Sequence, residues 1–334
     1  MKFSSFSVLV FALHAWAQLV VQKKAQYPLT ESSTSPSSIP LLGFGTWNLD
    51  RSNASDVVTY ALKTGYRHID CAAAYGNQKE VGKGIAEGLK NEGLKRSDIW
   101  VTSKLWNDHH RPDLVLKGLQ TTLSDLDLDY LDLFLMHWPV ASEPETGKTS
   151  LSYINTWHAM EALLATGKVK NIGVSNFSPA QISNLISSSL TKPFAHQMEL
   201  HPYLQQSTWV QWHQAHGIHV TAYSPLANSN PTYDGPKDDL PPQLLKSSVM
   251  EDIAEKRGCT PATVALAWGM SRGTSVIPKS AHASRIGENF GSLECDLHYE
   301  DFKTIEGLGR KYVHRFSNPS ERWGVPLYEG LDGT

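Results

Sequence analysis

Residues 67–76 of the chain read Arg67-His68-Ile69-Asp70-Cys71-Ala72-Ala73-Ala74-Tyr75-Gly76. The apolar strand core ends here in a carboxylate, Asp70, and a phenol, Tyr75, follows after a turn of small residues. Alone, such a pair is more often a capping acid and a packing aromatic side chain. Two later apolar runs, however, also end in titratable groups, Lys104 and His137. Four such groups at successive strand ends can perform acid–base chemistry.

Short apolar runs recur along the whole chain and predict eight β-strands. They cover residues 43–47, 68–72, 101–105, 133–137, 172–176, 196–200, 220–224 and 276–280. Amphipathic stretches between them predict helices over 55–64, 80–89, 114–126, 153–166, 179–188, 250–257 and 260–272. Because parallel strands need a crossover, this alternation predicts a parallel sheet. Eight such units indicate an α/β fold of the closed (β/α)8 type, a TIM barrel.

An open doubly wound sheet is the alternative to the barrel. Its nucleotide-binding signature needs three spaced glycines between an early strand and a helix. Gly43-Phe44-Gly45-Thr46-Trp47-Asn48 lacks the third glycine, and no helix starts there. Polar residues also gather at the carboxyl ends of the predicted strands, where barrel enzymes build their sites. They are Asp70, Lys104, His137, Ser175, Asn176, Gln197, Tyr223 and Lys279.

These strand-end groups suit the reduction of a carbonyl by a hydride donor. Negative charge develops on the carbonyl oxygen, so a proton donor must lie near it. Tyr75 is a weak acid at neutral pH, and we expect the ammonium of Lys104 to lower its pKa. Asp70 can keep that lysine charged and oriented, and His137 can donate a hydrogen bond to the carbonyl oxygen. Buried structural pairs would explain each residue alone, but not all of them at one barrel end.

The motifs around these residues resemble those of the aldo-keto reductases. The resemblance runs from about residue 39 to at least residue 289, and its motifs come in the family's order. They are Gly43-Phe44-Gly45-Thr46-Trp47, Tyr75-Gly76-Asn77, Lys104-Leu105-Trp106-Asn107, His137-Trp138-Pro139, Ile172-Gly173-Val174-Ser175-Asn176-Phe177, Gln197-Met198-Glu199, Tyr223-Ser224-Pro225-Leu226 and Ile277-Pro278-Lys279-Ser280. The resemblance implies a (β/α)8 barrel that uses NADPH to reduce aldehydes and ketones. It also implies the catalytic tetrad Asp70, Tyr75, Lys104 and His137.

The resemblance further implies where NADPH binds. Ser175, Asn176 and Gln197 would hold the nicotinamide carboxamide, and Tyr223 would stack on its ring. Lys279 and Arg285 can neutralise a 2′-phosphate, which favours NADPH over NADH. The full set of expected cofactor contacts is Gly45, Thr46, Trp47, Ser175, Asn176, Gln197, Tyr223, Ser224, Leu226, Lys279, Ser280, Arg285, Glu288 and Asn289.

Aromatic residues next to the catalytic strand ends predict the substrate site. Trp47, Trp106 and Trp138, together with His137, would form walls that suit apolar or aromatic aldehydes. Residues 228–242 are dense in Asn, Pro, Asp and Gly, and predict a mobile loop over the cofactor. Residues 315–323 resemble only loosely the loop that sets specificity in sugar-reducing members, which argues against a xylose reductase.

Composition narrows the class of protein. The chain has 334 residues, 40% hydrophobic and 19% charged, with a formal net charge of −3, as in a soluble globular protein. No basic block predicts a nucleic-acid partner. Cys71, Cys259 and Cys295 are few and show no metal-ligand spacing, so we expect neither a disulfide scaffold nor a metal site. The expected partner is a small-molecule carbonyl substrate. The sequence does not set the oligomeric state, and a monomer is compatible with it.

The first residues differ from the rest. Residues 1–17 have the pattern of a modest secretory signal peptide, or of a disordered extension, and are too short to span a membrane. Residues 18–38 predict a disordered linker, and residues 39–334 the single barrel domain with extended loops at its carboxyl face. Asn53-Ala54-Ser55 is a glycosylation sequon if the chain is secreted. A secreted enzyme would lack a supply of NADPH, which favours the cytoplasm over secretion.

Two readings of other classes compete with a reductase. A nucleotide-sensing regulatory subunit would keep the cofactor site and lose turnover, and the complete tetrad argues against it. A secreted binding protein rests on residues 1–17 alone.

Overall fold

The computed structural model describes residues 39–142, 151–229, 233 and 240–333. The predicted signal peptide and linker therefore lie outside the described residues. None of the helices in the described ranges is long and apolar enough to cross a membrane.

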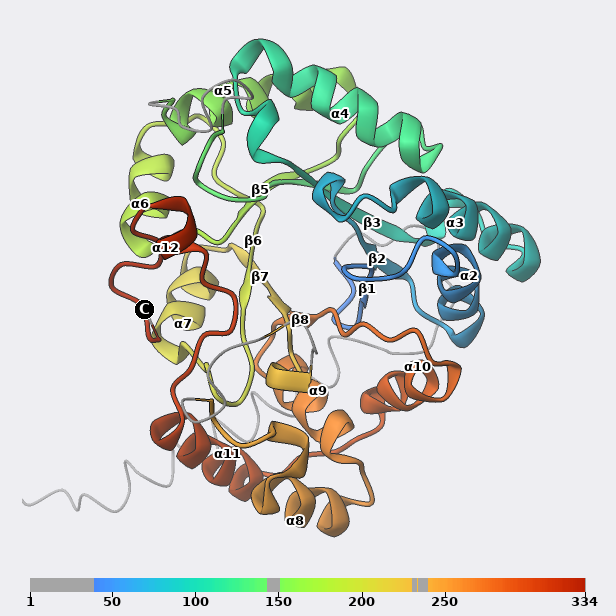
Figure 1. The fold of residues 1–334 in the computed structure, drawn as a ribbon, viewed down its shortest axis with the longest axis vertical. Helices are drawn as coiled ribbons and strands as arrows, with labels where there is room; N and C mark the ends of the chain where they lie inside the picture. Colours follow the sequence, from blue (N-terminus) through green and yellow to red (C-terminus); the bar gives the residue numbers. More distant parts are fainter. Residues whose placement is uncertain (1–38, 143–150, 230–232, 234–239, 334) are drawn as a thin grey trace, which may run out of the picture. The chain divides into compact units, whose positions relative to one another are not determined.

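Eight parallel strands form one sheet in chain order, β1 to β8. They are Phe44–Gly45, His68–Asp70, Trp100–Leu105, Leu133–Met136, Ile172–Ser175, Ala195–Glu199, His219–Tyr223 and Ser275–Val276. The sheet closes on itself, because the Val276 amide donates to the Leu41 carbonyl at 2.7 Å and the Val276 carbonyl accepts from the Gly43 amide at 2.8 Å. With helices around the strands (Figure 1), this confirms the predicted (β/α)8 barrel and excludes the open sheet.

The helices include the seven that the periodicity predicts. They are α2 (Ala54–Thr64), α3 (Gln78–Glu92), α4 (Pro112–Leu126), α5 (Tyr153–Leu163), α6 (Pro179–Ser187), α7 (Ser207–Ala215), α8 (Ser248–Arg257), α9 (Pro261–Ser271), α10 (Ala283–Phe290), α11 (Tyr299–Lys311) and α12 (Ser320–Trp323). Helices α10, α11 and α12 are missing from the sequence prediction, and so is α7, although α7 completes the unit between β6 and β7. Its histidine and tryptophan residues give it a weak helical pattern, and tertiary packing decides its structure.

Some predicted strands extend beyond the strands of the structure. β2 ends at Asp70 and β8 at Val276, so the residues that follow them are loops at the carboxyl end of the barrel. The amino end is closed by apolar side chains, among them Ile39, Trp100 and Leu133. Trp100 stacks on Phe194 there, with ring centroids 5.8 Å apart. Apolar side chains therefore fill the amino end of the barrel, and the polar residues gather at its carboxyl end.

Two glycines allow close approach between neighbouring segments. A Cβ on Gly173 would lie 2.4 Å from the Ala195 carbonyl oxygen, and one on Gly45 would lie 2.8 Å from the Ile277 carbonyl oxygen. Real Cβ atoms do not approach that closely, so any larger residue would push adjacent strands apart.

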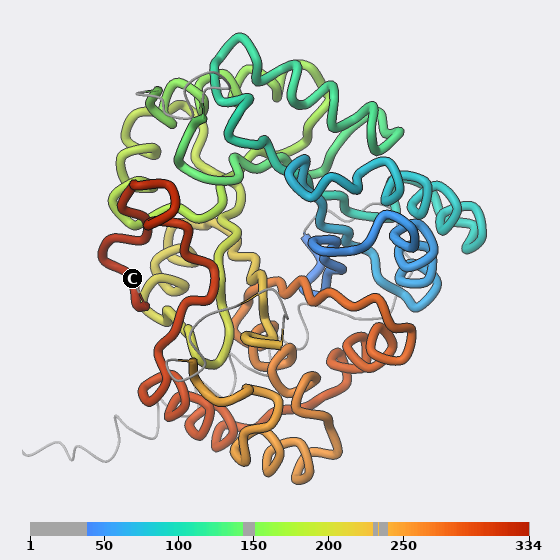
Figure 2. The backbone as a smooth tube through the Cα atoms, in the orientation of Figure 1, coloured from blue at the N-terminus to red at the C-terminus, as the bar shows by residue number. Residues whose placement is uncertain are grey.

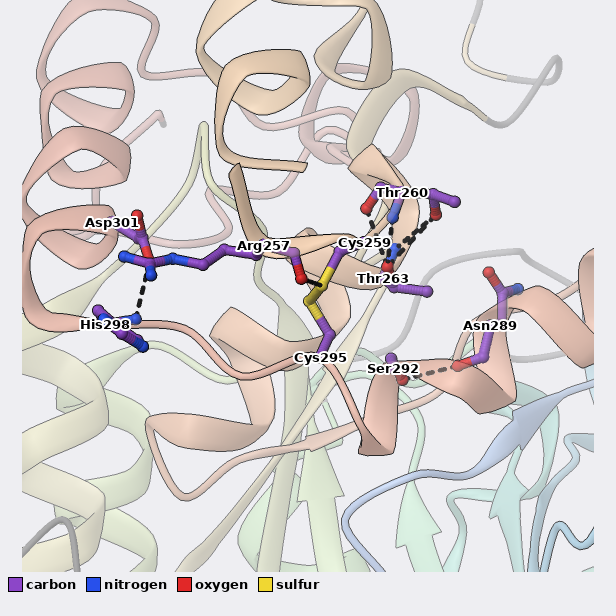
Figure 3. Close-up of a disulfide and its surroundings, with 9 residues drawn as sticks. All are labelled: Arg257, Cys259, Thr260, Thr263, Asn289, Ser292, Cys295, His298 and Asp301. Atoms are coloured by element: carbon purple, nitrogen blue, oxygen red, sulfur yellow. Dashed lines mark hydrogen bonds and ion pairs between the residues drawn. A yellow bond between two sulfur atoms is a disulfide. The ribbon is translucent and has the colours of Figure 1, made fainter. Parts of the chain in front are cut away.

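A disulfide joins Cys259, just after α8, to Cys295, beyond α10 (Figure 3). Beside it Arg257 donates to the Asp301 carboxylate at 2.7 Å, which ties the same two segments together. The sequence argued against a disulfide scaffold, and what forms is a single covalent tie. The two cysteines stand 36 residues apart and meet only because helix packing brings them together. In the chain-entropy account, closing such a loop stabilises the fold by roughly 4 kcal/mol.

After α11 the chain turns back toward the barrel. In Figure 2 this red segment runs from α11 toward the chain around β6 and α6. Leu327 and Tyr328 are buried and pack against Trp138, which follows β4. The C-terminal segment therefore covers part of the carboxyl end of the barrel, where the predicted site lies.

Candidate active site

A buried ion pair forms the centre of the predicted tetrad. Lys104 comes from β3 and Asp70 from the end of β2, and the two side chains are 0% and 1% exposed. The Lys104 Nζ donates to Asp70 Oδ1 at 2.6 Å, to the Cys71 carbonyl at 2.8 Å and to the Tyr75 hydroxyl at 3.2 Å. All three ammonium protons thus have an acceptor, so the lysine has one orientation. Its network links the carboxylate to the phenol.

Tyr75 reaches this network from a short 3₁₀ turn, η1 (Ala73–Tyr75). Gly76 ends the turn with φ 67°, a left-handed conformation that favours glycine. The ammonium of Lys104, 3.2 Å from the phenol, does not bring the net pKa of Tyr75 below its usual value. Burial, and then the charge of Asp70, raise the pKa of Tyr75 well above its usual value. The phenol therefore carries its proton at neutral pH.

His137 follows β4 and lies beside the phenol. Its ring meets that of Tyr75 edge-on at 6.0 Å and that of Trp106 at 5.1 Å. Burial, and then the positive charge of Lys104, hold the pKa of His137 well below its usual value. A neutral imidazole keeps one N–H, so His137 can donate a hydrogen bond without carrying a charge.

A cavity of about 890 Å³ opens over these groups. All of the predicted site residues line it except Thr46 and Lys104. Thr46 is fully buried, and its hydroxyl donates to the Asp70 carbonyl at 2.8 Å, which makes it a support for that strand end. Lys104 does not line the cavity, but its ammonium donates to the hydroxyl of Tyr75, which does. The volume lies within the range of small-molecule and cofactor sites.

Amide side chains line the cavity beside the tetrad. Asn176 has φ 63°, and its Oδ1 accepts a hydrogen bond from the Tyr223 hydroxyl at 2.7 Å. Its Nδ2 donates to the His137 carbonyl at 3.0 Å, which joins the ends of β4 and β5. Gln197 donates to Asp70 Oδ2 at 2.7 Å. Planar amide donors and acceptors thus converge near the phenol, as a carboxamide group would require.

Two cations mark the far end of the cavity. Lys279 follows β8 and Arg285 lies in the first turn of α10, and neither is in an ion pair within the described part of the chain. Burial, and then the charge of Arg285, lower the pKa of Lys279. Two neighbouring positive charges without a carboxylate partner favour an anionic ligand.

Aromatic side chains form the remaining wall. Trp47 is 37% exposed and lies 5.9 Å from Tyr233, while Trp138 meets Trp323 edge-on at 4.9 Å. The sequence prediction missed Tyr233 and the lining residues of the C-terminal segment, which include Phe316, Ser317, Arg322 and Trp323. All of them lie in two stretches that the sequence analysis singled out as loops, residues 228–242 and 315–323, without naming individual contacts.

Comparison with known proteins identifies the family of the chain. The model of the Aldo/keto reductase family matches residues 41–310. Aldo-keto reductase family 1 member A1 of Bos taurus is 41% identical over 284 residues, which are 81% of this chain and 86% of the relative.

Two solved structures share the fold. An aldose reductase from Giardia lamblia is 38% identical with a TM-score of 0.81, and the match covers 88% of this chain and 100% of that one. A Bombyx mori aldo-keto reductase in complex with NADP is 32% identical with a TM-score of 0.80, covering 89% and 99%. With the family model matched over most of its length, this chain belongs to the aldo/keto reductase family.

Proposed function

We infer that this protein is an NADP-dependent oxidoreductase that reduces aldehydes or ketones to alcohols. The main support for this function is the buried Asp70–Lys104–Tyr75 network beside His137, at the floor of a large cavity. The network provides a protonated acid and a charge that stabilises its conjugate base. Family membership supports the same reaction.

We propose the following roles for the tetrad. Tyr75 is the general acid, since burial keeps it protonated until a carbonyl oxygen gains negative charge. As its proton leaves, the phenolate forms 3.2 Å from the Lys104 ammonium, which stabilises it. Asp70 holds that ammonium in place from the opposite side. Neutral His137 donates a hydrogen bond that orients the carbonyl oxygen above Tyr75.

The cavity fits NADPH, whose nicotinamide supplies the hydride when bound. Asn176 and Gln197 offer amide groups next to the phenol, where the carboxamide would be held. Lys279 and Arg285, without carboxylate partners in the described residues, would receive the 2′-phosphate at the other end. We therefore propose NADPH as the preferred cofactor over NADH. The remaining predicted contacts, from Gly45 and Trp47 to Asn289, stay part of this proposal.

For the substrate we propose apolar or aromatic aldehydes. Trp47, Trp106, Trp138 and Trp323 surround the space above His137, and such walls favour apolar groups and exclude water. Sugars would leave hydroxyl groups unpaired against these rings.

Purified protein, incubated with NADPH and a panel of aromatic, aliphatic and sugar aldehydes, tests the proposal through the loss of NADPH absorbance. Tyr75→Phe removes the proton donor alone, so turnover should fall on the order of 10³-fold. NADPH affinity should stay within about twofold, because the ring remains. NADPH binding without turnover of any carbonyl would instead support the regulatory reading.

The site of action is a separate proposal. We propose the cytoplasm, because the reaction consumes NADPH; the Cys259–Cys295 disulfide is the observation against it, since disulfides are typical of oxidising compartments. The mass of the protein from its own cells is the test. Loss of residues 1–17 with a glycan on Asn53 would place it in the secretory pathway.

A further inference from the structure

The substrate end of the cavity is partly built by a segment far away in sequence. Phe316 and Ser317 line it, and so does Trp323 from α12. Phe316 stacks on Tyr233 at 5.4 Å and lies near His314 at 4.5 Å. These residues lie beyond the last strand and helix of the barrel repeat, so something must hold their backbone against the barrel.

Glu199, the last residue of β6, holds that backbone directly. Its Oε1 accepts from the Phe316 amide at 2.8 Å, and its Oε2 accepts from the Ser317 amide at 2.8 Å. His201 Nε2 lies 2.9 Å from the same Oε1. One carboxylate therefore fixes two consecutive peptide groups of the cavity wall.

The carboxylate is fully buried, at 0% exposure. Burial alone would raise the pKa of Glu199, but the hydrogen bond and charge of His201, the charge of Arg315 and the Phe316 amide outweigh it and hold the pKa below its usual value. A buried carboxylate that accepts amide hydrogens makes stronger bonds than a neutral acceptor. The two wall amides therefore offset part of the cost of burying this charge. Glu199 itself lies two residues after Gln197.

A second tie joins the same segment to the cofactor side. The Tyr328 hydroxyl lies 3.0 Å from the Ser317 carbonyl, to which it donates, and 3.3 Å from Asn176 Oδ1. The Arg315 guanidinium lies 4.0 Å above the Tyr328 ring. Tyr328 thus touches a predicted cofactor residue, whereas the Glu199 carboxylate contacts His201 and the two wall amides, so the two ties can be separated by substitution.

We propose that Glu199 is a positioning residue that sets which carbonyl substrates fit, by fixing the Phe316–Ser317 wall through its two backbone hydrogen bonds. This inference rests on the proposed reductase function. Substrates large enough to touch Phe316 depend on Glu199. Small substrates, which react at the tetrad without reaching that wall, do not.

Glu199→Gln is the direct test, because an amide NH₂ replaces one acceptor and faces a backbone N–H. For an aromatic aldehyde such as 4-nitrobenzaldehyde, kcat/KM should fall about tenfold, mostly through KM, since one hydrogen bond to a charged group is lost. For propanal, kcat/KM should stay within about twofold, as should the Kd of NADPH. Glu321→Gln makes the same change at an exposed position of the segment and should match the wild type.

A double substitution keeps the test decisive if stability drops. In a Phe316→Ala background the wall is already gone, so adding Glu199→Gln should change the aromatic-to-propanal ratio by less than twofold. Equal losses for both aldehydes, an equal rise in the NADPH Kd, or additive effects in the double variant would overturn the inference. Absence of any turnover in the wild-type protein would instead overturn the proposed function, and the inference with it.

Discussion

His137 and His68 are both buried histidines of the barrel, at opposite ends of their strands. Burial is the first cause in each case: it lowers the pKa of His68 to about 3 and that of His137 well below its usual value. Yet His68 Nε2 lies 3.1 Å from the Thr102 hydroxyl in the closed end of the barrel, whereas His137 lines the cavity. A shifted pKa alone therefore does not identify a functional residue; the space beside it does.

The same contrast holds for buried carboxylates. Asp132 is 2% exposed and pairs with Arg96 at 2.8 Å and with Lys170 at 3.0 Å, without lining the cavity. Asp70 is buried to the same degree and pairs with Lys104, whose third proton reaches the phenol. The Asp132 pairs tie together the segments that precede β3, β4 and β5, whereas the Asp70 pair connects to a group that faces the cavity.

Lys104→Met should have the largest effect. It leaves Asp70 charged and unpaired in the interior, which costs about 3–5 kcal/mol of unfolding free energy. Turnover should fall at least about 10²-fold, because the phenolate loses its counter-charge. Urea unfolding and steady-state kinetics measure the two effects. Lys117→Met, at an exposed position of α4, is the control; wild-type turnover in Lys104→Met would contradict the proposed network.

Arg285→Ala tests the far end of the cavity. Loss of one charged contact to the 2′-phosphate should raise the Kd of NADPH about 10- to 100-fold. NADH lacks that phosphate, so its Kd should stay within about twofold and is the internal control. Fluorescence titration measures both. Equal losses for the two cofactors would mean that Arg285 acts on α10 rather than on the phosphate.

His68→Leu tests the closed end of the barrel. Thr102 loses a hydrogen-bond partner in the interior, so the free energy of unfolding should fall by about 1–3 kcal/mol. Turnover of the folded enzyme should stay within about twofold. His137→Leu, the matched change in the cavity, should reverse the pattern, with lost turnover and little lost stability. A large activity loss in His68→Leu would contradict the purely structural role that separates His68 from His137.

The pH profile should show the smallest effect. Tyr75 stays protonated below its raised pKa, and His137 stays neutral above its lowered pKa, so neither changes charge near neutrality. With NADPH saturating, kcat for reduction should vary by less than about twofold from pH 6.5 to 9. A sigmoidal step inside that window would show that one of these groups titrates during turnover.

The sequence alone predicted the barrel, the order of its strands and the tetrad. These rest on local patterns: a strand–helix repeat is visible within each unit, and the four tetrad residues lie at or just after the ends of three strands, β2, β3 and β4. Helix ends differed by a few residues, and α7 was missed because its pattern is weak. Helices α10, α11 and α12, which follow the last strand, were missed as well.

What only the tertiary structure decided is which distant segments meet. Glu199 and Phe316 are 117 positions apart, and Cys259 and Cys295 are joined across 36, with no local pattern that pairs them. The raised pKa of Tyr75 likewise follows from burial, which sequence motifs do not express. Local periodicity encodes the barrel and its chemistry, whereas the shape of the substrate wall depends on long-range packing.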